Sequence, residues 1–226
     1  MKTIGLIGGT TWESTKEYYR FINQLTQERL GGVHSAKLIL YSVDFDFILS
    51  SSWEEKITLL SRKAKLLQNA GADCVLICAN TLHKLYNEVQ QSVQIPVIHI
   101  AKATGKTISE KGIKRVGLLG TRPTMEEDFY QSILKSEYGI ETLIPELDDR
   151  KFIQSVIYKE LSKGLFLAES KTRYLKICEK LISKGAEGII LGCTEIPLLI
   201  SQKDLKVPAF DTAYIHASAA VEFALI

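Results

Sequence analysis

Four consecutive residues, Gly192-Cys193-Thr194-Glu195, carry the side chains most suited to chemistry in this sequence. The apolar run 189–191 before them is typical of the end of a buried parallel strand. Thr194 is a good helix cap and Pro197 suits a first helical turn. Open α/β sheets bind ligands at such an edge, and a helix start lowers the pKa of a thiol from about 8.5. The pattern predicts a usable Cys193 thiolate, with a buried core cysteine as the equal alternative.

The composition is that of a globular protein with a sizeable core. Hydrophobic residues make up 46% of the 226 residues, and the formal net charge is +2 with both signs mixed along the chain. No basic stripe favours nucleic acid, and no apolar run approaches the roughly 18 residues of a membrane span. Because the chain enters a strand directly after Met1-Lys2-Thr3, without a signal-peptide pattern, we expect a cytoplasmic protein with no nucleic-acid or membrane partner.

The four cysteines are Cys74, Cys78, Cys178 and Cys193. Their spacing is neither CxxC nor a paired zinc pattern, so no metal site is predicted. A reducing compartment would leave all four as free thiols. Cys74 falls inside a predicted strand and Cys178 on the apolar face of a predicted helix, so we expect both in the core.

Short apolar strands alternate with amphipathic helices along the whole chain. The expected strands are 2–7, 36–43, 73–77, 93–100, 116–119, 140–144, 187–191 and 207–210. The clearest helices are 12–30 and 53–69, and another is expected at 124–136. This alternation predicts an α/β fold of parallel sheets flanked by helices.

The chain also matches itself in three places at a nearly constant offset. The matched pairs are 2–8 with 114–120, 71–77 with 185–191, and 95–98 with 207–210. Three matches in the same order imply two similar α/β domains. We expect the first at 1–103, completed by a C-terminal helix at 212–226, and the second at 104–211. A pseudo-two-fold would then put the active site in the cleft between them.

Two acid/base groups on opposite faces of a small substrate suit inversion at a carbon. The developing enediolate needs preorganised hydrogen-bond donors, usually the largest catalytic contribution. Residues that offer backbone or side-chain donors recur at the predicted strand ends: Gly9, Thr10, Thr11, Asn80, Thr81, Thr121, Thr124 and Thr194. Each threonine alone is most often a cap or turn residue, but their recurrence predicts a cradle for a carboxylate.

Several of these stretches resemble the aspartate/glutamate racemase family, most closely the bacterial L-aspartate/glutamate-type and broad-specificity amino-acid racemases. The stretches that carry the resemblance are Gly8-Gly9-Thr10-Thr11-Trp12-Glu13-Ser14-Thr15, Ser42-Val43-Asp44-Phe45, Asn80-Thr81-Leu82-His83-Lys84, Gly120-Thr121-Arg122-Pro123-Thr124-Met125-Glu126 and Gly192-Cys193-Thr194-Glu195. The resemblance covers nearly the whole chain. It implies racemisation of an amino acid by two cysteines, without a cofactor, and often in a homodimer.

The first cysteine of the family usually stands directly before Asn-Thr, a position that is Ala79 here. Alignment from Gly71 and Gly185 agrees, since it places Cys193 opposite Ala79 rather than Cys78. Two versions follow: Cys78 reaches the substrate by a local twist, or the enzyme works with Cys193 as its one thiol and favours one enantiomer. We favour the second.

Three further residues are candidates for supporting roles. Lys163 lies near the place where some aspartate racemases use a lysine, although a solvated helix-end lysine is an equal alternative. His83 could orient a polar group or simply pack. Glu195 could polarise Cys193 or favour a helix start. The loop 44–47 lacks the arginine with which some aspartate racemases bind the side-chain carboxylate.

Two rival functions stay open at this point. A single-cysteine decarboxylase of the same superfamily would generate the same carbanion by loss of CO2. An amino-acid-binding protein that has lost catalysis would explain Ala79. A thiol redox protein is disfavoured because the chain has no CxxC.

Overall fold

A computed structural model describes the whole chain, residues 1–226. By their contacts these residues form two compact units, Met1–His99 with His216–Ile226, and Ile100–Ile215. The boundaries expected from the sequence were 103/104 and 211/212. The division falls at 99/100 and 215/216 instead, so α5 (Ile100–Glu110) belongs wholly to the second unit.

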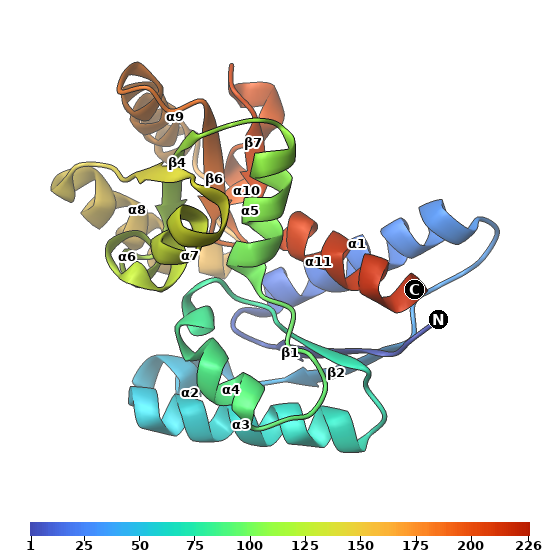
Figure 1. Cartoon of the computed structure of the whole chain (residues 1–226). Coiled ribbons are helices and arrows are strands. Elements are labelled where there is room, and N and C mark those ends of the chain that lie inside the picture. The colour runs from blue at the N-terminus through green and yellow to red at the C-terminus, as the bar shows by residue number, and fades with distance from the viewer. The chain divides into compact units, whose positions relative to one another are not determined.

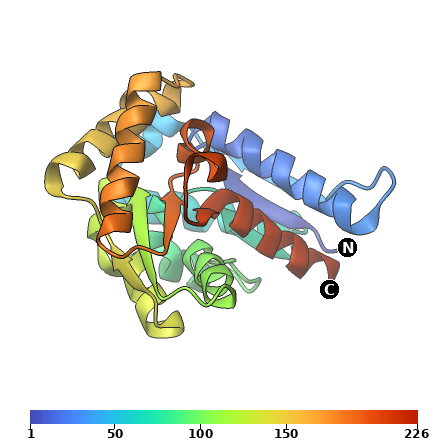
Figure 2. The same ribbon diagram turned by 90° about the horizontal axis from the view of Figure 1, so that it is seen from above.

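The first unit contains a three-stranded parallel sheet. Its central strand β1 (Ile4–Gly8) pairs with β2 (Leu38–Ser42) and β3 (Cys74–Ile77). Helices α1 (Trp12–Leu30) and α11 (Thr212–Leu225) lie side by side along one face (Figures 1 and 2). The remaining helical segments are α2 (Phe45–Ser50), α3 (Trp53–Asn69), η1 (Thr81–Leu85) and α4 (Tyr86–Gln91). Helix α3 covers the other face of the sheet, so both faces are buried.

The second unit contains a four-stranded parallel sheet with the order β5-β4-β6-β7. Its strands are β4 (Arg115–Gly120), β5 (Glu141–Leu143), β6 (Gly188–Gly192) and β7 (Ala209–Asp211). The helices after α5 are α6 (Arg122–Glu126), α7 (Asp128–Tyr138), α8 (Leu147–Lys159), η2 (Leu161–Lys163), α9 (Ala168–Ser183), α10 (Ile196–Leu199) and η3 (Gln202–Asp204). In neither unit does a helix combine the length and the hydropathy needed to cross a membrane.

The sequence repeat is also a structural repeat. Gly71 and Gly185 turn into β3 and β6 with φ angles of 94° and 95°. Four residues after each glycine, Val75 N–H donates to the Pro96 carbonyl at 2.9 Å and Ile189 N–H to the Pro208 carbonyl at 2.9 Å. The two units therefore use the same local connections, and the expectation of two similar parallel sheets is confirmed.

Two expected elements differ from the structure. The strand expected at 93–100 is reduced to a single parallel bridge between Val75 and Val97, because Pro96 has no N–H and α5 begins at Ile100. The helix expected at 124–136 is two helices, α6 and α7, since Glu127 between them is extended with φ −95° and ψ 155°.

Gly9 is the position in the first unit where only glycine fits. Its φ is +86°, and a Cβ built there would lie 2.0 Å from the Val43 carbonyl oxygen. Gly71 has a similar φ of +94° but open space around its missing Cβ.

We expect Gly71→Ala to lower the free energy of unfolding by about 1 kcal/mol, from φ strain alone. Gly9→Ala should cost about 3 kcal/mol or more, because the strand end must also move. Urea unfolding of both variants tests this, and equal losses would contradict the argument.

Candidate active site

Two glycines on neighbouring strands determine where the turn after β6 lies. Gly120 of β4 and Gly192 of β6 stand level in the register. A Cβ at Gly120 would lie 2.8 Å from the Gly192 carbonyl oxygen, so the absence of side chains lets the backbones approach. Thr121 and Cys193 therefore leave the sheet at the same edge, where a parallel α/β sheet presents its ligand-binding loops.

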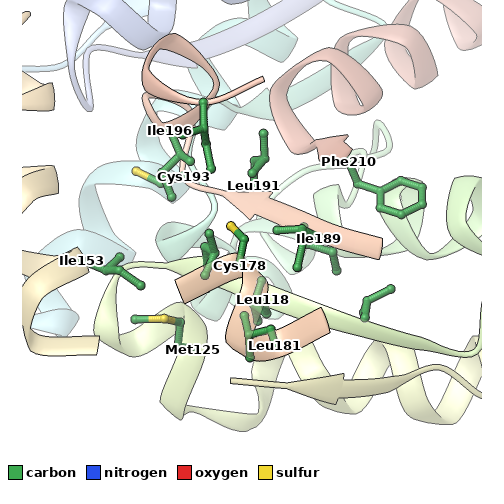
Figure 3. Close-up of a cluster of buried hydrophobic side chains, with 14 of the residues drawn as sticks. Leu118, Met125, Ile153, Cys178, Leu181, Ile189, Leu191, Cys193, Ile196 and Phe210 are labelled. Carbon is green, nitrogen blue, oxygen red and sulfur yellow. The ribbon is translucent and has the colours of Figure 1, made fainter. Parts of the chain in front are cut away.

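Cys193 and Glu195 form a buried pair in this turn. The Cys193 thiol donates to Glu195 Oε2 at 2.9 Å, and the Thr194 hydroxyl donates to the same oxygen at 3.0 Å. All three residues are buried. Figure 3 shows Cys193 beyond Leu191, at the end of the strand, and both Cys193 and Cys178 belong to the apolar cluster of the second unit. The carboxylate is thus placed to accept the thiol proton.

The expectation that Thr194 caps a helix is wrong. The N-cap position of α10 is Glu195, and no side chain caps this helix, which has only 4 residues. The Thr194 hydroxyl is directed to the Glu195 carboxylate instead of to a backbone N–H. The turn is therefore organised around the carboxylate of Glu195 and not around a helix start.

The expected lowering of the thiol pKa is also wrong. Burial raises the pKa of Cys193 well above its ordinary value, and the negative charge and acceptor oxygen of Glu195 raise it further. Backbone N–H groups of Glu195 and Thr194 bond to the sulfur and lower the pKa, but by less. The resting thiol is consequently protonated, with two amides already aimed at its sulfur.

Two predicted threonines of the second unit lie in the turn after β4. The hydroxyls of Thr121 and Thr124 are 3.1 Å apart, and both residues are buried. Lys163 ends η2, which contacts α10, and its exposed side chain makes no ion pair. The second unit thus places Thr121, Thr124, Thr194 and Cys193 at one sheet edge, with Lys163 on a segment that touches the helix after Cys193.

In the first unit, Cys78 occupies the position equivalent to Gly192. Ile7 pairs with Ile77, so Cys78 is level with Gly8, as Gly192 is with Gly120. Cys78 is fully buried, and burial raises the pKa of its thiol far above the ordinary value. Its carbonyl accepts the hydroxyls of Thr10 at 3.2 Å and Ser14 at 3.3 Å. The half-buried Ala79 takes the place that corresponds to Cys193.

The other predicted residues of the first unit hold local structure. Thr11 caps α1 by accepting the Ser14 N–H at 3.2 Å, and Gly9 N–H donates to Thr15 Oγ1 at 2.7 Å. Asn80, which is buried, and Thr81 begin η1 directly after Ala79. All of them lie at the carboxyl end of the first sheet, as predicted, and their proposed contacts with a substrate stay predictions.

A buried histidine cluster supports the Ala79 turn. His83 Nδ1 donates to the Ala79 carbonyl at 2.7 Å, and its ring centroid is 4.9 Å from that of His99 and 5.3 Å from that of His216. His216 Nε2 donates to the Ile98 carbonyl at 2.7 Å, and Nδ1 accepts the Tyr18 hydroxyl at 2.9 Å. Sequence reasoning missed His99 and Tyr18, since neither belongs to a motif.

The second unit also has a hollow of about 720 Å³ along α8 and α9. Its charged lining residues are Asp149, Glu160, Glu169, Arg173, Lys176 and Lys180. None of the predicted site residues lines it. Asp149 is paired there with Lys180 at 2.7 Å, so the hollow is separate from the predicted site.

The two parallel sheets and the cysteine turn define an α/β protein with a thiol and a carboxylate side by side at a strand end. A model of the Asp/Glu/Hydantoin racemase family matches residues 7–220, so the chain belongs to this family. The membership supports an amino-acid racemase activity.

Three similar proteins illustrate the relationship. "Broad specificity amino-acid racemase RacX" of Bacillus subtilis (strain 168) is 24% identical over 223 residues, which is 96% of each chain. The crystal structure of a "putative Asp/Glu Racemase" from Yersinia pestis is 46% identical, with a TM-score of 0.92 over 100% of both chains. That of an aspartate racemase homologue from Pyrococcus horikoshii OT3 is 38% identical, with a TM-score of 0.89 over 100% of both chains.

Because the clustered histidines are buried, we expect the protein to lose stability at mildly acidic pH. Burial lowers the pKa of His216 to about 3, with His83 adding to the shift, whereas an unfolded histidine titrates near about 6.5. The unfolded state therefore binds the proton first. The contribution of His216 to the free energy of unfolding is fully present above pH ~6.5 and falls by about 1.4 kcal/mol per pH unit below it. Burial also lowers the pKa of His83, to about 4, so His83 adds a similar slope.

Chemical unfolding between pH 7.5 and 4.5 measures this slope. His216→Gln should reduce the slope by about half, because His83 still titrates, and the exposed His34→Gln serves as the control that keeps it. An unchanged slope in His216→Gln would show that this ring does not titrate as the structure requires.

Proposed function

We propose that this protein is a cofactor-independent amino-acid racemase in which Cys193 moves the α-proton. The observation that carries the proposal is the 2.9 Å hydrogen bond from the Cys193 thiol to Glu195 at the carboxyl edge of the second sheet. Family membership and the names of the similar proteins support the reaction class.

The geometry suggests how a protonated thiol becomes a base. Glu195 Oε2 accepts the thiol proton, and the N–H groups of Thr194 and Glu195 stabilise the sulfur anion that is left. The thiolate then removes the α-proton of the substrate, and the electron pair moves into the carboxylate to give an enediolate. Hydroxyls of Thr121 and Thr124 are suited to stabilise its charge. Return of a proton to the opposite face of the carbon completes the inversion.

The version with one thiol is the one we propose. When the strand ends of the two units are aligned, Ala79 occupies the position of Cys193. Cys78 lies one residue earlier and is completely buried. A group other than a second cysteine would then protonate the opposite face, and exchange would favour one enantiomer. The shared cleft and the pseudo-two-fold inferred from the repeat stay predictions.

Acidic amino acids are the substrates we propose. The exposed, unpaired ammonium of Lys163 supplies a cation for a side-chain carboxylate, on a segment that contacts α10. The names of the similar proteins include an aspartate racemase homologue and a broad-specificity amino-acid racemase, which supports testing aspartate and glutamate first. The expected homodimer and cytoplasmic location stay predictions.

Substitution of each cysteine tests the proposal. Cys193→Ala should slow the exchange of the α-proton with solvent deuterium at least about 10³-fold, because the base is removed. Cys78→Ala should leave the exchange rate unchanged and serves as the matched control. Proton NMR of L- and D-aspartate and of L- and D-glutamate in D2O, without added cofactor, measures both rates.

Four results would contradict or change the proposal. Exchange by Cys193→Ala at the wild-type rate would refute it. An inactive Cys78→Ala would favour the two-thiol version, provided that its unfolding curve matches the wild type. Loss of CO2 from a substituted malonate, with amino acids inert, would favour the decarboxylase, and amino-acid binding without exchange would favour the binding protein.

A second experiment separates the two effects of Glu195. Glu195→Gln removes the charge that raises the pKa of Cys193, so the thiolate fraction at a given pH should rise and alkylation of Cys193 by iodoacetamide should accelerate. Racemisation should nevertheless fall about 10²-fold, because the acceptor of the thiol proton is gone. Faster racemisation together with faster alkylation would show that Glu195 only restrains the thiol.

A further inference from the structure

The helix that carries Thr124 is too short to hold its own position. Helix α6 has only 5 residues, whereas helices this short are not stable by themselves in water. It follows Thr121 directly and stops at Glu127, where the backbone is extended with φ −95° and ψ 155°. Contacts from outside the helix must therefore fix its place at the sheet edge.

The start of α6 is bonded to a side chain from another helix. Thr121 occupies the N-cap position, but its side chain makes no capping bond, and its hydroxyl lies 3.1 Å from that of Thr124. The Arg122 N–H has no acceptor within the helix and donates to Gln154 Oε1 at 2.8 Å. Gln154 thus supplies from α8 the acceptor that this helix start requires.

The end of α6 is held by the same face of α8. Arg150 and Gln154 are four residues apart, so they lie on one face of that helix. Arg150 Nε lies 3.1 Å from Oε1 of Glu126, the last residue of α6. Arg122 Nη2 lies 3.3 Å from the other oxygen of this carboxylate. Two residues of α8 consequently anchor both ends of α6.

This anchoring sets the position of Thr124 over the strand that ends at Cys193. A Cβ at Gly120 would lie 3.1 Å from Thr124 Cγ2, and one at Gly192 would lie 3.5 Å from it. The fully buried Thr124 side chain therefore covers the ends of both β4 and β6. Because Cys193 follows Gly192 directly, any displacement of α6 would move the Thr121–Thr124 hydroxyl pair relative to the thiol.

We propose that Gln154 is a positioning residue of the Cys193 site, which holds the hydroxyls of Thr121 and Thr124 in place by accepting the first N–H of α6. This inference rests on the proposed racemase function. Those hydroxyls are the donors proposed for the enediolate, and such stabilisation requires donors that are fixed before the charge develops. Gln154 itself is assigned no contact with the substrate. No sequence motif marks it, because its bond to Arg122 spans 32 residues.

Variants of Gln154 that differ in the acceptor test the inference. Gln154→Leu should lower kcat for α-proton exchange of aspartate or glutamate about 10-fold and change KM less than about 2-fold, because the enediolate loses more stabilisation than the bound amino acid. Gln154→Glu keeps an acceptor oxygen and should retain at least about half of the wild-type kcat. If Gln154→Leu does not fold, Gln154→Met, which is unbranched and also lacks the acceptor, takes its place.

A matched control removes an equivalent bond elsewhere. Gln68 Oε1 accepts the Gln94 N–H at 2.7 Å in the first unit, so Gln68→Leu loses a similar bond and should keep the wild-type kcat. In a Thr121→Val background, Gln154→Leu should lower kcat little further, because it acts through the hydroxyl pair. Urea unfolding of each variant identifies the temperature and buffer in which all are folded for the assay.

The outcomes separate this inference from the function on which it rests. An active wild type with Gln154→Leu indistinguishable from Gln68→Leu overturns the role of Gln154 and leaves the racemase intact. Equal losses in Gln154→Leu and Gln154→Glu overturn the role of the acceptor, as do fully additive losses in the Thr121→Val background. If the wild type exchanges no α-proton of either amino acid, the racemase and this inference both fail.

Discussion

The hydrogen bond between a buried thiol and a buried carboxylate is the interaction on which the candidate site depends. A carboxylate removed from water needs partners, and Glu195 finds them in the Cys193 thiol and the Thr194 hydroxyl. The same contact keeps the resting sulfur protonated and gives its proton a destination. Two backbone amides at the sulfur favour the opposite state. The balance between these groups lets a single turn both store and release a proton.

The sheets supply the geometry that this interaction requires. Parallel strands that end level with each other, at Gly120 and Gly192, deliver Thr121 and Cys193 to one edge. The first unit repeats the connections but has Ala79 where the second has its thiol. Its turn is instead held by His83, which packs against His99 and His216, and burial lowers the pKa of His83 and His216. The two halves have thus kept a common framework and diverged in the chemistry at its edge.

Much of the framework could be predicted from the sequence. Helices 12–30 and 53–69 begin and end as expected, because Thr11 and Ser52 cap them and Gly31 stops the first. The protonation state of Cys193 could not be predicted, since it depends on burial and on the side chain of Glu195 turning back towards the sulfur. Tyr18 was missed for a related reason: its hydrogen bond to His216 spans 198 residues.

The first unit is assembled from both ends of the chain. The Lys2 N–H donates to the Ala224 carbonyl at 2.9 Å, and the Tyr18 hydroxyl donates to His216 Nδ1. The second unit is continuous and can fold while the chain is still being synthesised. The first must wait for residues 216–226, which are synthesised after the whole of the second unit. Until then, the apolar face of its sheet beside α1 is incomplete, and this nascent half is the one that would engage chaperones.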